Sequence, residues 1–433
     1  MNRNCPRCND MACELNTSAL NFADIVQPGD TVCWGQAAAE PLALTQALLA
    51  QRAAIGDFSA FIGIGWSATP DVRFCDHVHF MSYCAIGTNR RLAAAGKLDI
   101  LPCHYSELYK FLQQRVDVLF LQLAPADEEG TYSLSLACDY LLPLIDTARI
   151  VVAEVNDQAP FTFCDRPIRA DEIDIIVRSS RPIVEAESPV FGPAESVIAR
   201  RVAGLVEDGA VLQMGIGTIP ECVVRALADH HNLGVHSGMI SDGIADLMEN
   251  GVVTNARKSI DRGVSVTGFL AGSSRLTKFA HRNPKILLRS TDYTHSQFVI
   301  QKLDRFTAIN SAIEVDLTGQ VNSETLRGQY VGAVGGAADF LRGAHASRGG
   351  LPIIALPATA AGRKGPASRI VCKLNGPVST SRADAGIIVT EHGIADLRGV
   401  PLAQRIERMI AIADPAFREN LQREAACNAA ANS

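Results

Sequence analysis

The stretch DGAVLQMGIGTIPECVVRAL, residues 208–227, decides the fold. It opens with a short apolar run, continues through a turn of small residues, and ends with apolar residues at helical spacing. This change of period predicts a strand, a tight turn and a helix in succession. Pro220 falls in the first turn of the predicted helix, where a missing backbone N–H is tolerated.

The same pattern occurs near the start of the chain, in PGDTVCWGQAAAEPLALTQAL, residues 28–48. Aliphatic runs predict further strands at 116–123, 150–155, 353–356 and 386–390, and helical patterns cover 193–206 and 219–228. Alternating strands and helices are typical of βαβ units with parallel strands. The sequence therefore predicts an α/β fold with two related domains, each a largely parallel sheet flanked by helices.

The boundary between the two domains is expected within residues 185–197. This segment contains two prolines and a glycine and has no clear hydrophobic period, as linkers often do. We therefore expect an N-terminal domain over 1–190 and a C-terminal domain over 191–433. Two such related domains are expected to pack with a cleft between them, and the cleft is the expected place for an active site.

Composition excludes several classes of function. Of the 433 residues, 47% are hydrophobic and 20% charged, which is typical of a globular protein, and the net charge of −6 argues against a nucleic-acid binder. No apolar stretch reaches the roughly 18 residues that a membrane span needs. The N-terminus lacks the apolar core of a signal peptide. We expect a cytoplasmic protein with no nucleic-acid or membrane partner.

The twelve cysteines indicate neither disulfides nor a metal site. Most lie in apolar or mixed runs, where a cysteine in a reducing compartment is usually a small core residue. Cys5 and Cys8 have the spacing of half a zinc site, with Cys13 nearby, but no second pair of ligands follows. The sequence therefore predicts no bound metal.

The turn between the strand and helix of residues 208–227 is a candidate anion site. Gly215, Gly217 and Thr218 are expected to present backbone N–H groups at a helix N-terminus, which suits a pyrophosphate. The full dinucleotide fingerprint needs a third glycine where this chain has Pro220, so a tight turn without a ligand is the alternative.

Two further segments are candidate ligand sites. Glycines are dense from 328 to 343, and the consecutive Gly335 and Gly336 bring N–H groups together as an oxyanion hole requires; a mobile loop is the alternative. Residues 361–370 concentrate Arg363, Lys364 and Arg369, which suit phosphates or a substrate carboxylate. Ordinary surface charge is the alternative for these cations.

Taken together, these motifs resemble the acetyl-CoA hydrolase/transferase family, in particular its 4-hydroxybutyrate and butyrate (itaconate-type) CoA-transferase branch. The resemblance covers nearly the whole chain. It is carried by AEP at 39–41, AEVN at 153–156, GIGTIP at 215–220, ISDG at 240–243, NSAIEVDLTGQV at 310–321, VGG at 334–336, SRI at 368–370, TSR at 380–382 and VTEHGIA at 389–395.

The resemblance implies an enzyme that moves CoA between an acyl-CoA and a small carboxylic acid, with coenzyme A as substrate and no tightly bound cofactor. It implies a covalent route, in which a glutamate attacks the acyl-CoA and later carries the CoA as a thioester. It places CoA at Gly215, Gly217, Thr218, Lys364 and Arg369. Relatives also suggest a homodimer or a higher homo-oligomer.

One position departs from the family pattern. The family's glutamate lies in a His-Ser-Glu-Met-like segment, and here residues 235–242 are VHSGMISD, so the expected nucleophile position is Gly238. Glycine has no side chain that could form the anhydride. Another carboxylate is therefore needed, or the acceptor acid attacks the thioester directly, or transfer has given way to hydrolysis or to simple binding.

Glu40 is the preferred replacement, because it lies at the turn of the first repeat. The alternative is that this acid favours the N-terminus of its helix. Glu314, Asp316 and Glu324 are lesser candidates, since their context also fits a strand face. Two histidine–acid pairs, His236 with Asp242 and His392 with Glu391, are candidates for activating water, with a structural histidine as the alternative.

The sequence thus predicts a CoA-transferase of the 4-hydroxybutyrate, butyrate or itaconate type, with Glu40, Gly335 and Gly336 as catalytic residues. The alternatives are an acyl-CoA hydrolase and a non-catalytic acyl-CoA-binding protein.

Overall fold

The computed structural model describes residues 13–187, 189–362 and 365–431. The chain divides into two compact units, one formed by Met1–Glu187 with Val266–Tyr293 and the other by Ser188–Ser265 with Thr294–Ser433. The second unit is therefore interrupted by a segment that belongs to the first. Each unit is described below by itself.

The first unit is built on an eight-stranded sheet with the order β1-β9-β7-β6-β2-β3-β4-β5, in which every neighbouring pair is parallel. In chain order its strands are β1 (Cys13–Leu15), β2 (Thr31–Trp34), β3 (Phe58–Phe61), β4 (Val78–Ser82), β5 (Leu98–Ile100), β6 (Val118–Leu123), β7 (Ile150–Asn156) and β9 (Ile175–Ser179). Its helices are α1 (Leu42–Ile55), α2 (Asn89–Ala94), α3 (Tyr105–Gln113), α4 (Leu141–Ile145) and α8 (Ser274–Ala280). The strands β8 (Phe163–Cys164) and β13 (Ile286–Leu288) pair in parallel. The segment Val266–Tyr293, which interrupts the second unit, begins in β12 (Ser265–Leu270) and ends in α9 (Thr291–Thr294).

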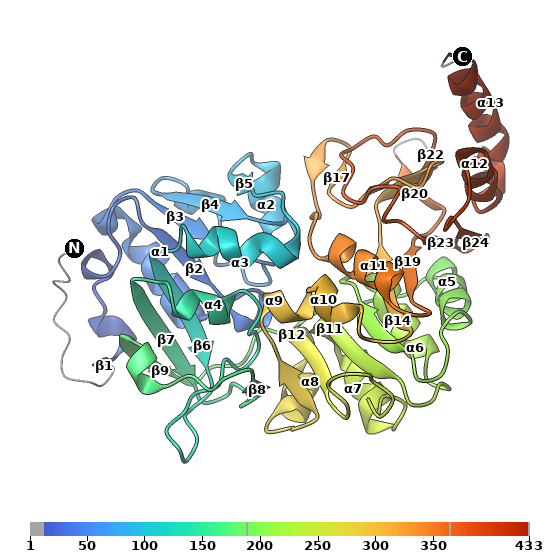
Figure 1. Ribbon diagram of the computed structural model, residues 1–433. Helices are drawn as coiled ribbons and strands as arrows, with labels where there is room; N and C mark the ends of the chain where they lie inside the picture. The colour runs from blue at the N-terminus through green and yellow to red at the C-terminus, as the bar shows by residue number, and fades with distance from the viewer. Residues whose placement is uncertain (1–12, 188, 363–364, 432–433) are drawn as a thin grey trace. The chain divides into compact units, whose positions relative to one another are not determined.

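The second unit contains strands in the order β24-β23-β19-β14-β10-β11, parallel except for the antiparallel edge pair β23 and β24. These strands are β10 (Val211–Met214), β11 (Gly234–Ile240), β14 (Phe306–Ser311), β19 (Leu351–Ala355), β23 (Ile387–Thr390) and β24 (Gly393–Asp396). Its helices are α5 (Pro193–Ala203), α6 (Thr218–Ala226), α7 (Asp242–Glu249), α10 (Gln297–Ile300), α11 (Ala337–Ala346), α12 (Leu402–Ala411) and α13 (Pro415–Ala431). One small sheet contains β15 (Glu314–Asp316), β16 (Val321–Asn322) and β22 (Ile370–Val371). A second pairs β17 (Thr325–Leu326) with β18 (Gln329–Tyr330), and a third pairs β20 (Thr359–Gly362) with β21 (Gly365–Ser368). In Figure 1, α10 and α11 lie side by side.

The internal repeat of the sequence corresponds to a repeat of topology. In the first unit β2 lies between β3 and β6, and beyond β6 come β7 and β9. In the second unit β10 lies between β11 and β14, and beyond β14 come β19 and β23. Each repeat is a strand, a turn and a helix, namely β2 with α1 and β10 with α6. The predicted α/β fold with mostly parallel sheets and flanking helices is confirmed.

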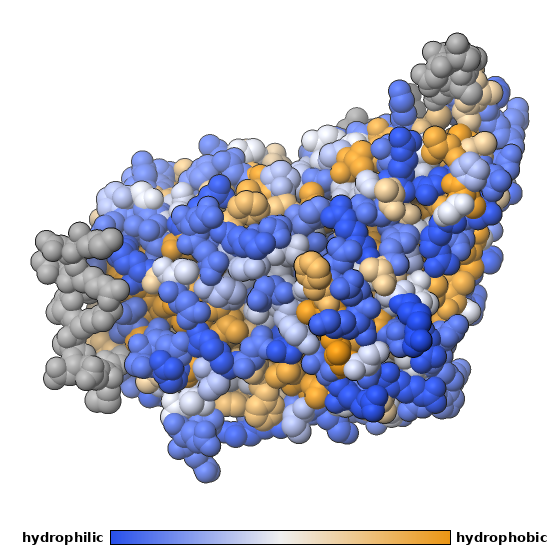
Figure 2. All heavy atoms as spheres, in the orientation of Figure 1, coloured by the Kyte–Doolittle hydropathy of each residue, from blue (hydrophilic) through white to orange (hydrophobic). Residues whose placement is uncertain are grey.

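The central strands are buried on both faces. Every residue of β6 and β7 is buried, and so is every residue of β10 and β23. Strands with this burial occur where helices cover both faces of a parallel sheet, which explains why the sequence shows continuous aliphatic runs there instead of alternation. Within the described residues no helix is both long enough and apolar enough to cross a membrane. The face drawn in Figure 2 mixes hydrophilic and hydrophobic residues over both parts of the chain.

A buried polar network lies within the first unit around Asp139. The Asp139 carboxylate accepts hydrogen bonds from Gln36 Nε2 at 2.7 Å, from Tyr105 Oη at 3.1 Å and from the Tyr140 backbone N–H at 2.7 Å. Gln36 in turn accepts a hydrogen bond from Tyr83 Oη at 2.8 Å. Burial is the largest influence on this carboxyl and raises the pKa of Asp139 to about 6, although the hydrogen bonds act in the opposite direction.

This raised pKa predicts a pH-dependent stability. The folded chain holds the Asp139 proton more tightly than the unfolded chain does. The protonated carboxyl therefore makes its full contribution to the free energy of unfolding below about pH 4, and this contribution is lost between about pH 4 and pH 6. A shift of about two units corresponds to about 3 kcal/mol. In urea unfolding, the free energy of the wild type relative to Asp139→Asn is expected to fall by this amount from about pH 4 to pH 7. If the free energies of unfolding of the two proteins change with pH in the same way, the raised pKa does not belong to Asp139.

Candidate functional site

The predicted anion turn follows β10 in the second unit. The Gly215 N–H donates to Ile309 O at 2.8 Å, and a Cβ at Gly215 would lie 2.7 Å from Asn310 Oδ1, so a side chain there would have to displace the Asn310 amide. Gly217 has φ of +129°, a backbone conformation that favours glycine, and it is the N-cap of α6. The first N–H groups of α6, from Thr218 onward, have no partner within the helix by its geometry. The turn therefore has the form of an anion site.

Side chains tie the carboxyl end of β10 to its two neighbours. Gln213 and Asn310 exchange amide hydrogen bonds of 2.9 and 3.3 Å between β10 and β14. Ser237 Oγ of β11 accepts a hydrogen bond from the Met214 N–H at 3.1 Å and donates one to Met214 O at 3.3 Å. These contacts fix the Gly215 turn relative to the segment that holds Gly238.

The segment with the missing glutamate is the second half of β11. His236 and Ser237 are fully buried, whereas Gly238 and Met239 are half-buried. The His236 Nε2 lies 2.9 Å from Thr294 O, and the His236 ring meets the Phe306 ring edge to face. His236 is therefore a core residue anchored to the chain just before α10. Asp242 begins α7 and lies on a different element from this ring.

A histidine that the sequence analysis did not single out lies against Gly238. A Cβ at Gly238 would lie 3.1 Å from His295 Cε1 and 3.2 Å from His295 Nε2. The His295 Nδ1 is 2.9 Å from Thr294 Oγ1, and its ring lies 4.4 Å from the Phe340 ring. His295 is 5% exposed, and burial, followed by the nearby His236, lowers the pKa of His295 to about 3. The imidazole is thus neutral at physiological pH.

The predicted oxyanion loop leads to the same imidazole. Gly335 has φ of +59°, and a Cβ there would make only an ordinary contact, at 3.6 Å, with Ala333 Cβ. Gly336 is the N-cap of α11. A Cβ at Gly336 would lie 2.5 Å from His295 Nε2 and 2.6 Å from His295 Cδ2. The structure therefore brings together Gly238, Gly336 and His295, with Phe340 against the ring. No spacing in the sequence links residue 295 to either glycine.

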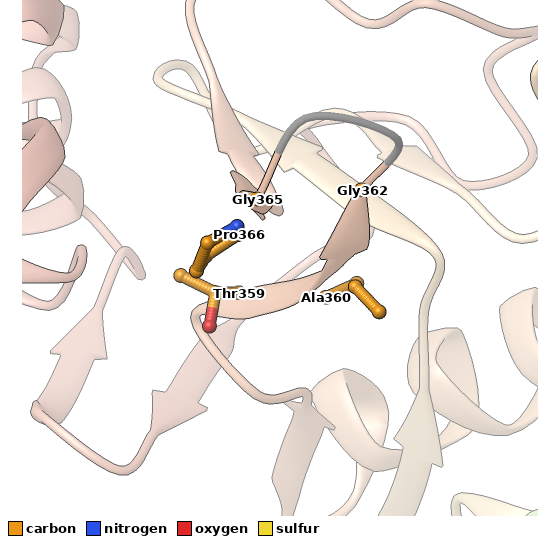
Figure 3. Close-up of a pocket in the computed structure, with 6 residues that line it drawn as sticks. Thr359, Ala360, Gly362, Gly365 and Pro366 are labelled. Atoms are coloured by element: carbon orange, nitrogen blue, oxygen red, sulfur yellow. The ribbon is translucent and has the colours of Figure 1, made fainter.

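The basic segment is only partly described. Arg363 and Lys364 lie outside the described residues. Arg369 Nε donates to Ile313 O at 2.7 Å and its Nη2 donates to Ala312 O, while burial lowers the pKa of the guanidinium. These contacts give Arg369 a role in holding the chain after β14. The neighbouring β20–β21 hairpin lines a pocket of about 400 Å³, shown in Figure 3, with Thr359, Ala360, Ala361, Gly362, Gly365 and Pro366 at its walls.

Glu40 lies in the first unit, directly after the short 3-10 helix Ala37–Ala39. Its side chain is buried, with Oε1 accepting from Thr45 Oγ1 at 3.0 Å and Oε2 accepting from Ser67 Oγ at 2.6 Å. Burial raises the pKa of Glu40. Its backbone carbonyl accepts from Arg181 Nη2 at 2.9 Å. The carboxyl is therefore held by hydrogen bonds on both oxygens.

The lesser candidate acids all accept hydrogen bonds inside the second unit. Glu314 accepts from Asn322 and Asn375, and Glu324 accepts from Ser379 and Tyr330. Asp316 accepts from the backbone N–H groups of Thr318 and Gln320. In the second histidine–acid pair, the Glu391 carboxylate accepts a hydrogen bond from the Ala358 N–H. His392 Nε2 lies 3.8 Å from the Glu391 carboxylate and 3.5 Å from that of Asp414. Each of these acids has a local structural contact.

A cluster that could hold a metal ion is not found among the described residues. Cys5 and Cys8, the half of a zinc pattern, lie outside that part of the chain, and Cys13 is an exposed free thiol on β1.

Comparisons with known proteins agree with this architecture. The chain is 41% identical to the 4-hydroxybutyrate coenzyme A transferase of Clostridium kluyveri, over 78% of this chain and 80% of that protein. It is 35% identical to the succinyl-CoA:cyclohexane-1-carboxylate CoA transferase of Geobacter metallireducens, over 93% of each. Among solved structures, RipA from Yersinia pestis superposes with a TM-score of 0.90 at 32% identity, over 95% of this chain and 97% of that one.

A second solved structure, the 4-hydroxybutyrate CoA-transferase of Porphyromonas gingivalis, superposes with a TM-score of 0.79 at 33% identity, over 96% of this chain and 98% of that one. Models of the acetyl-CoA hydrolase/transferase N-terminal and C-terminal domains match residues 14–186 and 272–425. The chain therefore belongs to the acetyl-CoA hydrolase/transferase family, as its motifs implied.

Proposed function

We propose that this protein is a CoA-transferase that moves CoA from an acyl-CoA to a small carboxylic acid of the 4-hydroxybutyrate, butyrate or itaconate type. The observation that carries the proposal is the likeness to transferases along the chain. Relatives named for CoA transfer with 4-hydroxybutyrate, with succinyl-CoA and cyclohexane-1-carboxylate, and with butyryl-CoA and acetate share 32–41% identity with it over 78–93% of its length. Relatives named acetyl-CoA hydrolase share 28–30% identity over 48–59% of it.

We assign the parts of the reaction to the two glycine turns of the second unit. Gly215, Gly217 and Thr218 would contact the phosphates of CoA, because a turn at a helix N-terminus favours an anion. Gly335 and Gly336 would hold the thioester oxygen as negative charge develops on it. Lys364 and Arg369 stay proposed contacts for CoA, with Arg369 acting through the backbone that it holds. No tightly bound cofactor is needed for this chemistry.

The proposed transfer is tested by supplying an acyl-CoA with and without a carboxylic acid. New acyl-CoA is expected only when butyrate or 4-hydroxybutyrate is present, together with little release of free CoA. Equal CoA release in both reactions would identify a hydrolase. Binding of acyl-CoA without either product would identify a binding protein. The two products are separated by liquid chromatography, and free thiol is measured in parallel.

The nucleophile is tested at Glu40. If Glu40 replaces the missing glutamate, borohydride added after acyl-CoA will reduce a Glu40 thioester, and peptide mapping will locate the modified residue. Glu40→Gln is then expected to abolish both the label and the transfer. Transfer by an unlabelled protein would instead assign the attack to the acceptor carboxylate itself. Thr45→Val, which removes one hydrogen bond to Glu40 Oε1, is the matched control for disturbance of the turn.

We also propose that the protein acts in the cytoplasm as a homodimer or a higher homo-oligomer. Light scattering of the purified protein tests the oligomeric state, and a single-chain mass would contradict it.

A further inference from the structure

We propose that Glu324 is a positioning residue for the proposed oxyanion loop, residues 331–336, and that its buried carboxylate keeps the amides of Gly335 and Gly336 in place during CoA transfer. This inference rests on the proposed function, in which these two glycines hold the thioester oxygen. Glu324 acts on the substrate only through the loop, which is a different role from that of a nucleophile.

The first half of the loop is tied to the backbone at Glu324. The Glu324 carbonyl accepts hydrogen bonds from the Val331 N–H at 2.8 Å and from the Gly332 N–H at 3.0 Å. The carbonyl of the preceding residue, Ser323, accepts one from the Ala333 N–H at 3.2 Å. The two backbone segments approach so closely that a Cβ at Gly332 would lie 2.0 Å from Ser323 O. Movement of Glu324 would therefore move residues 331–333 with it.

The loop has little chain between its two anchors. Residue 333 ends the part that is bonded to Ser323 and Glu324, and only Val334 and Gly335 separate it from Gly336, the N-cap of α11. The Gly336 carbonyl already belongs to the helix, since it accepts from the Phe340 N–H at 3.2 Å. A shift of the first anchor must therefore be absorbed at the two glycines whose amides form the proposed oxyanion hole. Misplacement of a catalytic group by about 1 Å can cost about 10²-fold in rate.

The Glu324 carboxylate fixes this backbone by joining it to two other segments. The side chain is 4% exposed, with Oε2 accepting from Tyr330 Oη at 2.8 Å and Oε1 accepting from Ser379 Oγ at 2.7 Å. Tyr330 ends β18 and directly precedes the loop. Ser379 Oγ also accepts from the Ser323 N–H at 2.9 Å, so it binds both the residue before Glu324 and the Glu324 side chain. Because polar groups buried in this way are costly to leave unpaired, the carboxylate gives these segments one defined arrangement.

The positioning role is tested with Glu324→Ala and Glu324→Gln. The alanine variant is expected to lower kcat by about 10–100-fold through misplacement of the loop, with KM for acyl-CoA changed by less than about threefold. Glutamine fills the same space and can pair with two hydroxyl groups, which donate or accept, so Glu324→Gln is expected to keep kcat within about threefold of the wild type. A kcat for Glu324→Ala within about threefold of the wild type would overturn the role. Equal losses in the two variants would overturn it too, because they would assign the effect to the negative charge.

Two buried serines provide a matched pair of variants. Ser379 and Ser347 are 7% and 6% exposed, and each hydroxyl donates one hydrogen bond and accepts one from a backbone N–H. Ser347 follows the C-terminal end of α11, and its partners are Leu303 O and the Phe306 N–H, which are not part of the loop. Ser379→Ala is expected to lower kcat by at least about fivefold and Ser347→Ala by less than about twofold, with similar falls in the urea midpoint. Equal losses of kcat would show that general destabilisation is the cause.

Amide hydrogen exchange tests the anchor without reference to catalysis. Exchange in the peptide covering residues 331–336 is expected to be at least about tenfold faster in Glu324→Ala and unchanged in Ser347→Ala. Tyr330→Phe, which removes one hydroxyl, is expected to change exchange and kcat in the same direction and replaces Glu324→Ala if that variant does not fold.

The exchange measurement also separates the anchor from the proposed function. Unchanged exchange in both Glu324→Ala and Tyr330→Phe would overturn the anchor even where transfer is observed. If exchange rises but the wild type releases CoA equally with and without a carboxylate, the proposed transfer is wrong while the anchor stands. The loss of kcat is then measured on hydrolysis.

Discussion

Replacing Arg181 by methionine is expected to lower the free energy of unfolding by about 3–5 kcal/mol, because it leaves a buried carboxylate without its cation. The Glu154 side chain is 0% exposed, and its Oε1 lies 2.5 Å from Arg181 Nε. The same guanidinium donates to Gln122 Oε1 at 2.6 Å and to the Glu40 carbonyl. The loss of Arg181 therefore also releases the turn that carries Glu40.

The matched control lies three residues earlier on the same segment. Arg178 forms an ion pair with Glu14 at 2.5 Å, but both side chains are more than half exposed, at 58% and 53%. Exposed pairs of this kind contribute about 0–1 kcal/mol. Urea unfolding of Arg181→Met and Arg178→Met measures both effects. Equal shifts in the two midpoints would show that burial of the Glu154 pair does not govern stability.

Replacing Gly336 by valine is expected to lower CoA transfer by about 10²-fold or more. A Cβ at this position would lie 2.5 Å from His295 Nε2, so the added side chain forces the imidazole or the proposed oxyanion loop to move. The φ of −93° at Gly336 is allowed for any residue, which means that the collision and not backbone strain causes the loss. The rate of acyl-CoA formation measures the effect.

The control for this substitution is Gly204→Ala at the end of α5. That glycine also has a negative φ, of −66°, and its nearest neighbour would lie 3.5 Å from an added Cβ, which is an ordinary contact. Gly204→Ala is expected to transfer CoA at the wild-type rate. A folded Gly336→Val variant that transfers CoA at the normal rate would contradict the proposal that this loop holds the thioester oxygen. Gly335→Val is also expected to lose activity, but there the φ of +59° adds strain to the change.

Much of the fold could be predicted from the sequence because the deciding signals are local. The run 116–123 was predicted as a strand and forms β6, Val118–Leu123, since a fully buried parallel strand needs an unbroken aliphatic run. The stretch 208–227 forms β10, the Gly215 turn and α6, because glycine and proline restrict the backbone at fixed positions. The family followed from the order of many short motifs along the chain.

The site was only partly predictable. Gly238 could be recognised as a missing carboxylate because the family pattern fixes the neighbouring histidine and serine. What fills the space beside it could not be recognised, since His295 is 57 residues away and belongs to no motif. The contact of His295 with Gly238 and Gly336 depends on how β11, α10 and α11 pack. Such packing results from many weak contacts between distant segments, so it cannot be predicted from any one stretch of sequence.

By itself, the sequence determined the repeated strand–turn–helix unit, the parallel α/β architecture and the family, because backbone restriction and hydrophobic period act over a few neighbouring residues. Only the tertiary structure decided that Glu40 is a buried carboxyl with both oxygens hydrogen-bonded, and that His295 lies between Gly238 and Gly336. The physical reason is that burial and close approach between distant segments are properties of the packed chain, and they set both the charge and the available space of a side chain.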